Sequence, residues 1–170
     1  MKISNNRKYF NEIVLPKFIS KLEKNSVVLD IGKSDIWHNL YLELFNGFDY
    51  KTIDKNSTVK PDIHLDIETN NSPNAIPLKH ADAIICHGVL EQCENPFVLV
   101  QQLSEILKKD GFILFTFISL GYPDYSVDNL RFTLKGSFHL LQNYFEIIDT
   151  DVVSSNNTTE AIFHICRNKY

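Results

Sequence analysis

The chain has 170 residues, of which 44% are hydrophobic and 22% are charged, and its formal net charge is −4. This length and composition suit one globular domain with a sizeable core. No cluster of lysine and arginine is present, which argues against a nucleic-acid partner.

The cysteines and the N-terminal segment bear on the compartment. The three cysteines, Cys86, Cys93 and Cys166, are odd in number and too sparse for a disulfide framework, which fits a reducing compartment. The first residues, MKISNNRKYFNEIV, lack the apolar core and the cleavage site of a signal peptide, and no apolar run approaches membrane-spanning length. The sequence therefore predicts a soluble cytoplasmic protein with no membrane partner.

Helix-like and strand-like segments alternate along most of the chain. Apolar residues recur at helical spacing over 9–22, with Pro16 placed to start or kink the second half, which predicts a helical cover over 1–25. Ser34 or Asp35 is the expected N-cap of the next helix. We expect strands over 26–31, 48–54, 62–66, 81–87 and 112–118, and helices over 35–45 and 97–109.

The last part of the chain departs from this alternation. A helix expected over 134–143 is followed by strands over 144–153 and 160–168 with only a turn between them, which predicts an antiparallel hairpin. The whole pattern predicts a single-domain α/β, Rossmann-like fold. Its central sheet is mostly parallel with a C-terminal antiparallel β-hairpin, and helices cover both faces.

Four short motifs occur in order between these elements. They are LDIG (29–32), TID (52–54), VLEQ (89–92) and DNLRFT (128–133). With them, the chain over about residues 26–166 resembles the class I S-adenosylmethionine-dependent methyltransferases, and within these it is most similar to a small bacterial type. The resemblance implies one methyltransferase-like domain, 1–170, with a cofactor-binding half over 26–118. The substrate-side loop, helix and hairpin then follow over 119–170.

The candidate site residues follow the strands. Ligands of open α/β sheets bind beyond the carboxyl ends of the strands, where Asp30, Asp54, Asp66 and Cys86 with His87 all fall. Asp54 lies 22 positions after Gly32, near the spacing at which a carboxylate accepts both hydroxyls of a ribose. The alternative for Asp54, next to Lys55, is a solvated strand end.

The resemblance assigns roles to these positions. It implies that Asp30 meets the amino group of the methionine part of S-adenosylmethionine, and that Gly32 lets the backbone approach the ligand. It also implies that Asp66, with Ile67 beside it, accepts the adenine amino group, a role for which Asp62 competes. The alternatives are an ordinary strand exit at Gly32 and a loop-capping carboxylate at Asp66. The predicted cofactor-binding residues are Asp30, Gly32, Ser34, Asp54, Lys55, Asp66, Ile67, Cys86 and His87.

The acceptor side has fewer candidates. His87 is the candidate catalytic base, with a hydrogen-bonded rim histidine as the alternative. A metal site at Cys86, His87 and Cys93 is not predicted, because no CxxC pair is present. In the family, the region of Tyr122, Tyr125 and Arg131 helps to close the substrate side. Arg131 has a structural alternative, an ion pair with Asp128 at the start of a helix capped by Thr133.

Two departures from the family pattern leave the function open. Gln92 replaces the histidine of VLEH and cannot take a proton, and Lys33, Ser34 and Trp37 replace a more glycine-rich turn. The first hypothesis is a methyltransferase acting on a small molecule or a glycan precursor. The second is an inactive methyltransferase-fold binding or scaffolding module. A nicotinamide dehydrogenase is excluded, because a pyrophosphate requires a turn with more glycines than this one. The acceptor and the oligomeric state do not follow from the sequence.

Overall fold

A seven-stranded sheet forms the centre of the protein in the computed structural model, which describes residues 5–33, 38–69, 76–120, 128–155 and 157–170. The strand order is β3-β2-β1-β4-β5-β7-β6. The strands are β1 (Val27–Ile31), β2 (Asp49–Asp54), β3 (Ile63–His64), β4 (Ala81–His87), β5 (Leu107–Ile118), β6 (Phe145–Ser155) and β7 (Thr158–Asn168).

Strand pairing follows the order of apolar runs and turns in the chain. The first five strands pair in parallel, β7 runs antiparallel to β5, and β6 runs antiparallel to β7. Parallel neighbours require crossovers that place helices on the sheet faces, whereas the short turn between β6 and β7 permits only a hairpin. The predicted fold class is therefore confirmed.

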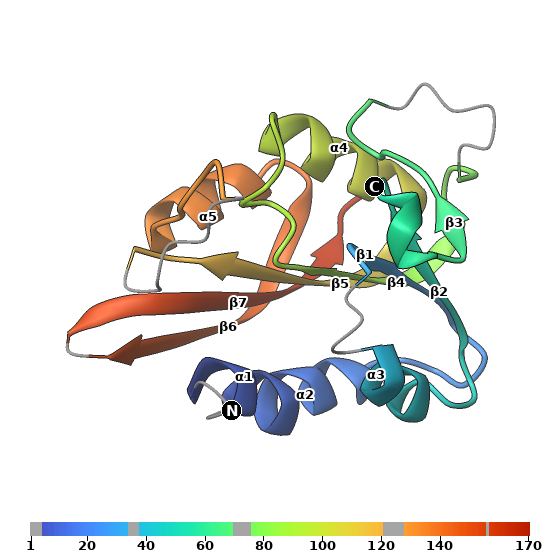
Figure 1. The fold of residues 1–170 in the computed structure, drawn as a ribbon, viewed down its shortest axis with the longest axis horizontal. Coiled ribbons are helices and arrows are strands. Elements are labelled where there is room, and N and C mark those ends of the chain that lie inside the picture. Colours follow the sequence, from blue (N-terminus) through green and yellow to red (C-terminus); the bar gives the residue numbers. More distant parts are fainter. Residues whose placement is uncertain (1–4, 34–37, 70–75, 121–127, 156) are drawn as a thin grey trace.

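Helices cover both faces of the sheet (Figure 1). The N-terminal helical segment and α3 lie on one face, and α4 and α5 lie on the other. The helical elements are α1 (Asn5–Tyr9), the π-helical turn η1 (Phe10–Val14), α2 (Leu15–Ile19), α3 (His38–Leu44), the 3-10 turn η2 (Ser57–Val59), α4 (Pro96–Ile106) and α5 (Leu134–Leu141).

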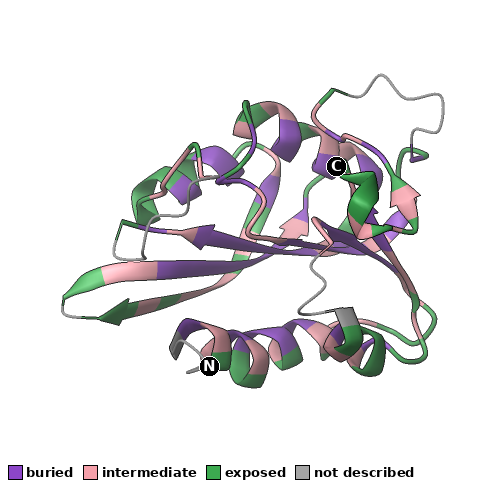
Figure 2. Cartoon of the chain, viewed as in Figure 1, coloured by how far each residue is buried: buried purple, intermediate pink, exposed green. Residues whose placement is uncertain are grey.

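The core is split by the sheet into two layers, and buried residues follow the strands through the centre of the molecule (Figure 2). Neighbouring residues of a strand point to opposite faces, so Val28 packs in the layer under the N-terminal helix while Leu29 packs under α4. The interior strand β4 is apolar on both faces from Ala83 to Cys86, as a doubly covered strand requires.

The boundary between α4 and β5 differs from the prediction. The helix expected over 97–109 ends at Ile106, and β5 already begins at Leu107. The predicted helix stop acts instead as an irregularity within β5: Asp110 has φ 61°, and the register against β4 shifts between Ala81 and Ala83. The apolar side chain of Leu107 continues the helical spacing of the sequence, which is why the predicted helix is too long. In the structure Leu107 belongs to β5 and packs in the core.

Capping explains the starts of α4 and α5. The Asn95 side chain accepts hydrogen bonds from the N–H groups of Phe97 (3.2 Å) and Val98 (3.3 Å), which cap α4. Thr133 caps α5 by accepting from the Gly136 N–H at 3.0 Å, as predicted. The cap expected at Ser34 or Asp35 lies outside the described residues.

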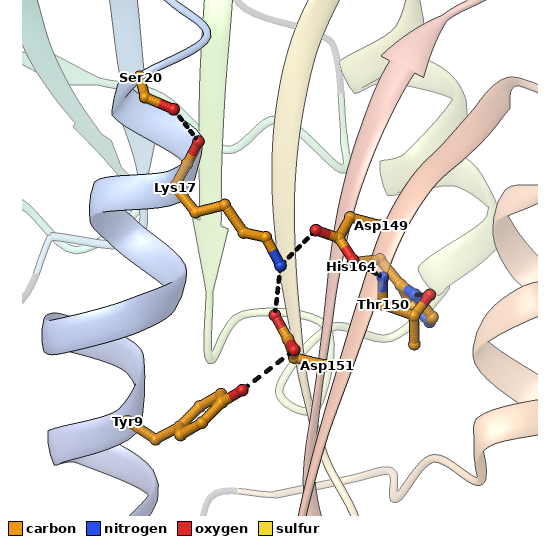
Figure 3. Close-up of polar contacts among 7 residues, drawn as sticks. All are labelled: Tyr9, Lys17, Ser20, Asp149, Thr150, Asp151 and His164. Carbon is orange, nitrogen blue, oxygen red and sulfur yellow. Dashed lines mark hydrogen bonds and ion pairs between the residues drawn. The ribbon is translucent and has the colours of Figure 1, made fainter.

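The N-terminal helical segment is attached to the hairpin as well as to the sheet. Lys17 forms ion pairs with Asp149 and with Asp151 on β6, the latter at 3.4 Å, and the Tyr9 hydroxyl donates to Asp151 at 3.1 Å (Figure 3). The side chain of Asn6 donates to Glu160 on β7 at 2.9 Å. These contacts hold the first helical turns against the last two strands.

Candidate functional site

A cavity of about 450 Å³ opens at the carboxyl ends of the parallel strands. Residues that follow β1, β2, β3 and β4 line it, together with the end of β5, the start of β7 and α1. Its size is within the range of small-molecule sites, and its position matches the ligand crevice of open α/β sheets. Of the predicted residues, Gly32, Asp54, Lys55, Asp66, Ile67 and His87 line this cavity.

Gly32 lies where the turn after β1 passes close to Val89, the second residue after β4. Its φ is +87°, and a Cβ atom built on it would lie 2.5 Å from Cγ2 of Val89. Its N–H donates to the carbonyl of Ile53 at 2.9 Å, which ties the turn to β2. The glycine is therefore required first by the protein's own packing, and the absence of a side chain also leaves its backbone on the cavity wall.

Asp54 ends β2 and reaches the cavity. Its Oδ1 atom accepts a hydrogen bond from the Asn56 N–H at 2.7 Å, which gives the carboxylate a fixed orientation. Oδ2 accepts no hydrogen bond from the residues described in the structure. The side chain of Lys55 is exposed at the same edge of the cavity.

Asp66 and Asp62, which compete for one role in the sequence, have different surroundings. Asp62 accepts from both the N–H and the hydroxyl of Thr52, at 2.8 and 2.7 Å, and is not part of the cavity wall. Asp66 lines the cavity, and its Oδ1 accepts from the Glu68 N–H at 3.1 Å. The neighbouring Ile67 is 7% exposed and forms an apolar part of the wall.

His87 ends β4 and packs edge-on against Phe10 of the N-terminal segment, with 4.3 Å between ring centroids. Burial lowers the pKa of His87 to about 4, helped by the positive charge of Arg7. The ring is therefore neutral near pH 7 and a weak base. Its catalytic role stays a prediction.

Cys86, one residue earlier, points into the core and does not line the cavity. Its thiol is fully buried, and burial raises its pKa well above the usual value. Among the described residues, no group of three or more histidine, cysteine, aspartate or glutamate side chains is arranged to hold a metal ion.

Asp30 does not line the cavity and lies on the sheet face that also carries Tyr41 of α3. It is 4% exposed, and Oδ2 accepts a hydrogen bond from the Tyr50 hydroxyl at 2.6 Å. Burial raises the pKa of Asp30 to about 7, with the Tyr50 hydrogen bond opposing and the Asp54 charge adding to this rise. Asp30 is absent from the cavity wall. Its contact with a ligand amino group therefore has no support from the cavity lining and stays a prediction.

Arg131 forms the ion pair with Asp128 that the sequence offers as the alternative to a contact with the methyl acceptor. Its Nη2 pairs with Asp128 at 2.7 Å, and its Nη1 donates to the carbonyl of Ser119 at 3.3 Å. Asp128 lines the cavity and Arg131 does not. Two other predicted acceptor contacts, Tyr122 and Tyr125, lie outside the described residues, as does Ser34.

Glu91 is a cavity residue that the sequence reasoning missed. It is 1% exposed, and its Oε1 accepts from the Ile118 N–H at the end of β5 at 2.6 Å. Burial raises the pKa of Glu91 to about 7. The signal was present in VLEQ, in which Glu91 directly precedes Gln92. Gln92 is exposed, and its side chain donates to the Gly88 carbonyl at 3.1 Å.

The chain was compared with known proteins. No family model and no curated protein matches the sequence. Among solved structures, the N-methyltransferase NodS from Bradyrhizobium japonicum is 13% identical with a TM-score of 0.72, and the match covers 100% of both chains. An S-adenosylmethionine-dependent methyltransferase from Archaeoglobus fulgidus is 14% identical with a TM-score of 0.71, covering 93% of this chain and 94% of that one.

The cyclase SpnF is also similar, at 13% identity and a TM-score of 0.76, with 96% of this chain and 81% of that chain covered. One fold therefore carries proteins with different activities, and at such identities the likeness concerns the fold alone. No described helix is long and apolar enough to cross a membrane. The comparisons show that this chain has the Rossmann-like fold of S-adenosylmethionine-dependent methyltransferases.

Proposed function

We propose that this protein is an S-adenosylmethionine-dependent methyltransferase that acts on a small molecule or a glycan precursor. The observation that carries the proposal is the placement of Asp54 and Asp66 in one cavity, on a fold shared with such enzymes. In each carboxylate Oδ1 is held by a backbone N–H, while Oδ2 accepts no hydrogen bond from the described residues. A ribose and an adenine amino group supply the donors that these oxygens lack.

The cavity then has two sides. We name the part lined by Gly32, Asp54, Asp66 and Ile67 the cofactor side, and the part lined by Phe10, Ile118, Asp128 and Phe163 the acceptor side. On the cofactor side Asp54 accepts the ribose hydroxyls and Asp66 accepts the adenine amino group, with Ile67 against the ring. Lys55 lies at the exposed edge of the cavity, while Asp30 and Cys86 are buried outside the cavity wall.

S-adenosylmethionine supplies a methyl group on a positively charged sulfur, which is an activated leaving group. The protein therefore has to bring donor and acceptor into line and exclude water, and such positioning accounts for much of the rate in a displacement of this kind. Phe10 and Phe163, from opposite ends of the chain, give the acceptor side apolar walls that serve this purpose.

Titration calorimetry with S-adenosylmethionine and S-adenosylhomocysteine tests the proposal. We expect both to bind, and we expect Asp54→Ala to weaken both at least about tenfold, because a bidentate charge-assisted contact is lost. Asp49→Ala, at the exposed opposite end of β2, is the matched control and should change neither affinity. If neither ligand binds at millimolar concentration, the proposal fails and a binding or scaffolding module replaces it.

A further inference from the structure

Glu91 lines the cavity, and one of its carboxylate oxygens is buried without a partner among the residues that the structure describes. Glu91 Oε2 is buried and accepts no hydrogen bond from the part of the chain that the structure describes, whereas Oε1 of the same side chain accepts one from the Ile118 N–H. A buried polar atom without a partner destabilises the folded protein, and a charged one does so more strongly. An arrangement of this kind therefore calls for a ligand that supplies the missing donor.

Glu91 is also firmly positioned. Its carbonyl accepts from the N–H groups of Asn129 (2.7 Å) and Leu130 (3.0 Å), so the backbone is bonded to the segment that follows Asp128. Its side chain reaches the end of β5 through Ile118. A residue fixed at both its backbone and one carboxylate oxygen keeps the second oxygen in a constant place.

The position of Glu91 is at the boundary between the two sides of the cavity. It follows β4, which lies between β1 on the cofactor side and β5 on the acceptor side. The point of methyl transfer lies at this boundary under the proposed function, on which this inference rests.

We infer that Glu91 is a catalytic residue whose Oε2 accepts the hydrogen bond, and then the proton, of an N–H or O–H group on the methyl acceptor. The acceptor's lone pair forms a bond to the methyl carbon as the bond from that carbon to sulfur breaks, and the electron pair of the broken bond stays on sulfur. The proton of the acceptor's N–H or O–H moves to Oε2 and later leaves to water. The acceptor is therefore an amine or an alcohol.

The surroundings of Glu91 suit a base that works near neutral pH. Burial is the main cause that raises its pKa to about 7. Hydrogen bonds from the backbone N–H groups of Ile118 and of Glu91 itself oppose the rise, as does the Arg131 charge, and the Asp128 charge adds to it. The thiols of Cys86 and Cys93 have raised pKa values and stay protonated, and His87 with a pKa of about 4 stays neutral. Glu91 is thus better matched to proton transfer at neutral pH than His87.

Sinefungin tests this without a known acceptor, because it carries an ammonium group where S-adenosylmethionine carries its methyl, whereas S-adenosylhomocysteine carries nothing there. We expect Glu91→Gln to weaken sinefungin binding by about tenfold or more, the effect of losing a charge-assisted hydrogen bond, and to leave S-adenosylhomocysteine almost unchanged. The glutamine oxygen can still accept from Ile118, so the fold is kept. Asp54→Ala is the matched control and should weaken both ligands in parallel.

A second measurement follows the pH dependence of binding. In the unaltered protein, sinefungin affinity should rise relative to that of S-adenosylhomocysteine between pH 6 and 8, as Glu91 ionises. Asp30 titrates in the same range, and Glu91→Gln separates the two because it should abolish only the Glu91 contribution. An equal effect of Glu91→Gln on both ligands, or none on sinefungin, overturns the inference. Failure of both ligands to bind the unaltered protein is the failure of the proposed function itself.

Discussion

At the scale of single residues, the turn after β1 shows how backbone conformation and packing constrain the same position. Gly32 combines a positive φ with a close approach to Val89, so that both its backbone and its missing side chain are required. Gly88 also has a positive φ, +66°, but a Cβ atom there would meet nothing within 4 Å. The two glycines therefore separate the cost of backbone strain from the cost of a steric clash.

We predict that Gly32→Ala lowers the free energy of unfolding by about 2–4 kcal/mol, of which about 1–2 kcal/mol is backbone strain and the rest is overpacking. Gly88→Ala should cost only the strain. Adding Val89→Ala to Gly32→Ala should recover part of the loss, because the methyl group that causes the clash is removed. Urea denaturation measures all of these, and equal losses for the two glycine variants would contradict the packing argument.

At the scale of elements, the N-terminal helical segment depends on the hairpin at the other end of the chain. The pairs of Lys17 with Asp149 and Asp151 hold two carboxylates of β6 against α2, and the hydrogen bond from Asn6 to Glu160 reaches β7. The hydrogen bond of Lys17 to Asp149 raises the pKa of this lysine, and the same contact lowers that of Asp149. These contacts hold a wall of the cavity, because Asn6 and Phe10 line it.

We predict that Lys17→Met destabilises the protein by about 1 kcal/mol at low salt and by less at 1 M salt, since the lysine is partly exposed and its ion pairs are screened. Lys8→Met is the matched control: Lys8 pairs with Glu12 at 3.9 Å, with both side chains more than half exposed, and its loss should have almost no effect. Chemical denaturation at two salt concentrations gives the answer. A loss that does not shrink with salt would mean that the lysine acts through its apolar stem.

At the scale of the whole molecule, buried titratable groups act in opposite directions on stability. His87 and His164 have pKa values lowered by burial from 6.5 to about 4, so the unfolded chain binds protons first and their contribution to stability is lost as pH falls through this window. Asp30 and Glu91 have pKa values raised to about 7, so the folded chain binds protons first and their contribution is lost as pH rises. Between about pH 4 and pH 6.5 the pH dependence that the two histidines give to the free energy of unfolding nearly cancels that of the two carboxylates.

We predict that the free energy of unfolding changes little between pH 4.5 and 6.5 in the unaltered protein. Asp30→Asn should make it rise with pH by up to about 1.4 kcal/mol per unit, because the histidines are no longer balanced. His164→Gln should make it fall with pH instead; its ring lies between the hydroxyls of Ser137 (2.8 Å) and Thr150 (2.9 Å), and glutamine keeps polar atoms there. Urea titrations at several pH values measure these slopes, and identical slopes in all three proteins would refute the balance.

Much of the fold could be predicted from the sequence, because a strand buried on both faces, such as β4, has consecutive apolar residues in its sequence. The end of α4 could not, since Leu107 fits a helix stripe and a sheet core equally well. Within the site, the shared location of Asp54 and Asp66 could be predicted, because the carboxyl ends of parallel strands meet at one edge of the sheet. The orientation of the Glu91 carboxylate could not be predicted, because it is set by a hydrogen bond from the N–H of Ile118, which comes close to Glu91 only in the folded chain.

The order of the strands along the chain also determines which parts of the protein can fold while the chain is still being synthesised. The apolar side of the N-terminal segment, with Phe10 and Val14, packs in one layer with Phe163 and Ile165 of β7, which is synthesised after the other strands of the sheet. During translation that side stays uncovered while the parallel strands form, and the cavity lacks a wall until β7 is inserted beside β5. A nascent chain that ends before β6 is therefore expected to need a chaperone, although it already contains Asp54, Asp66 and Glu91.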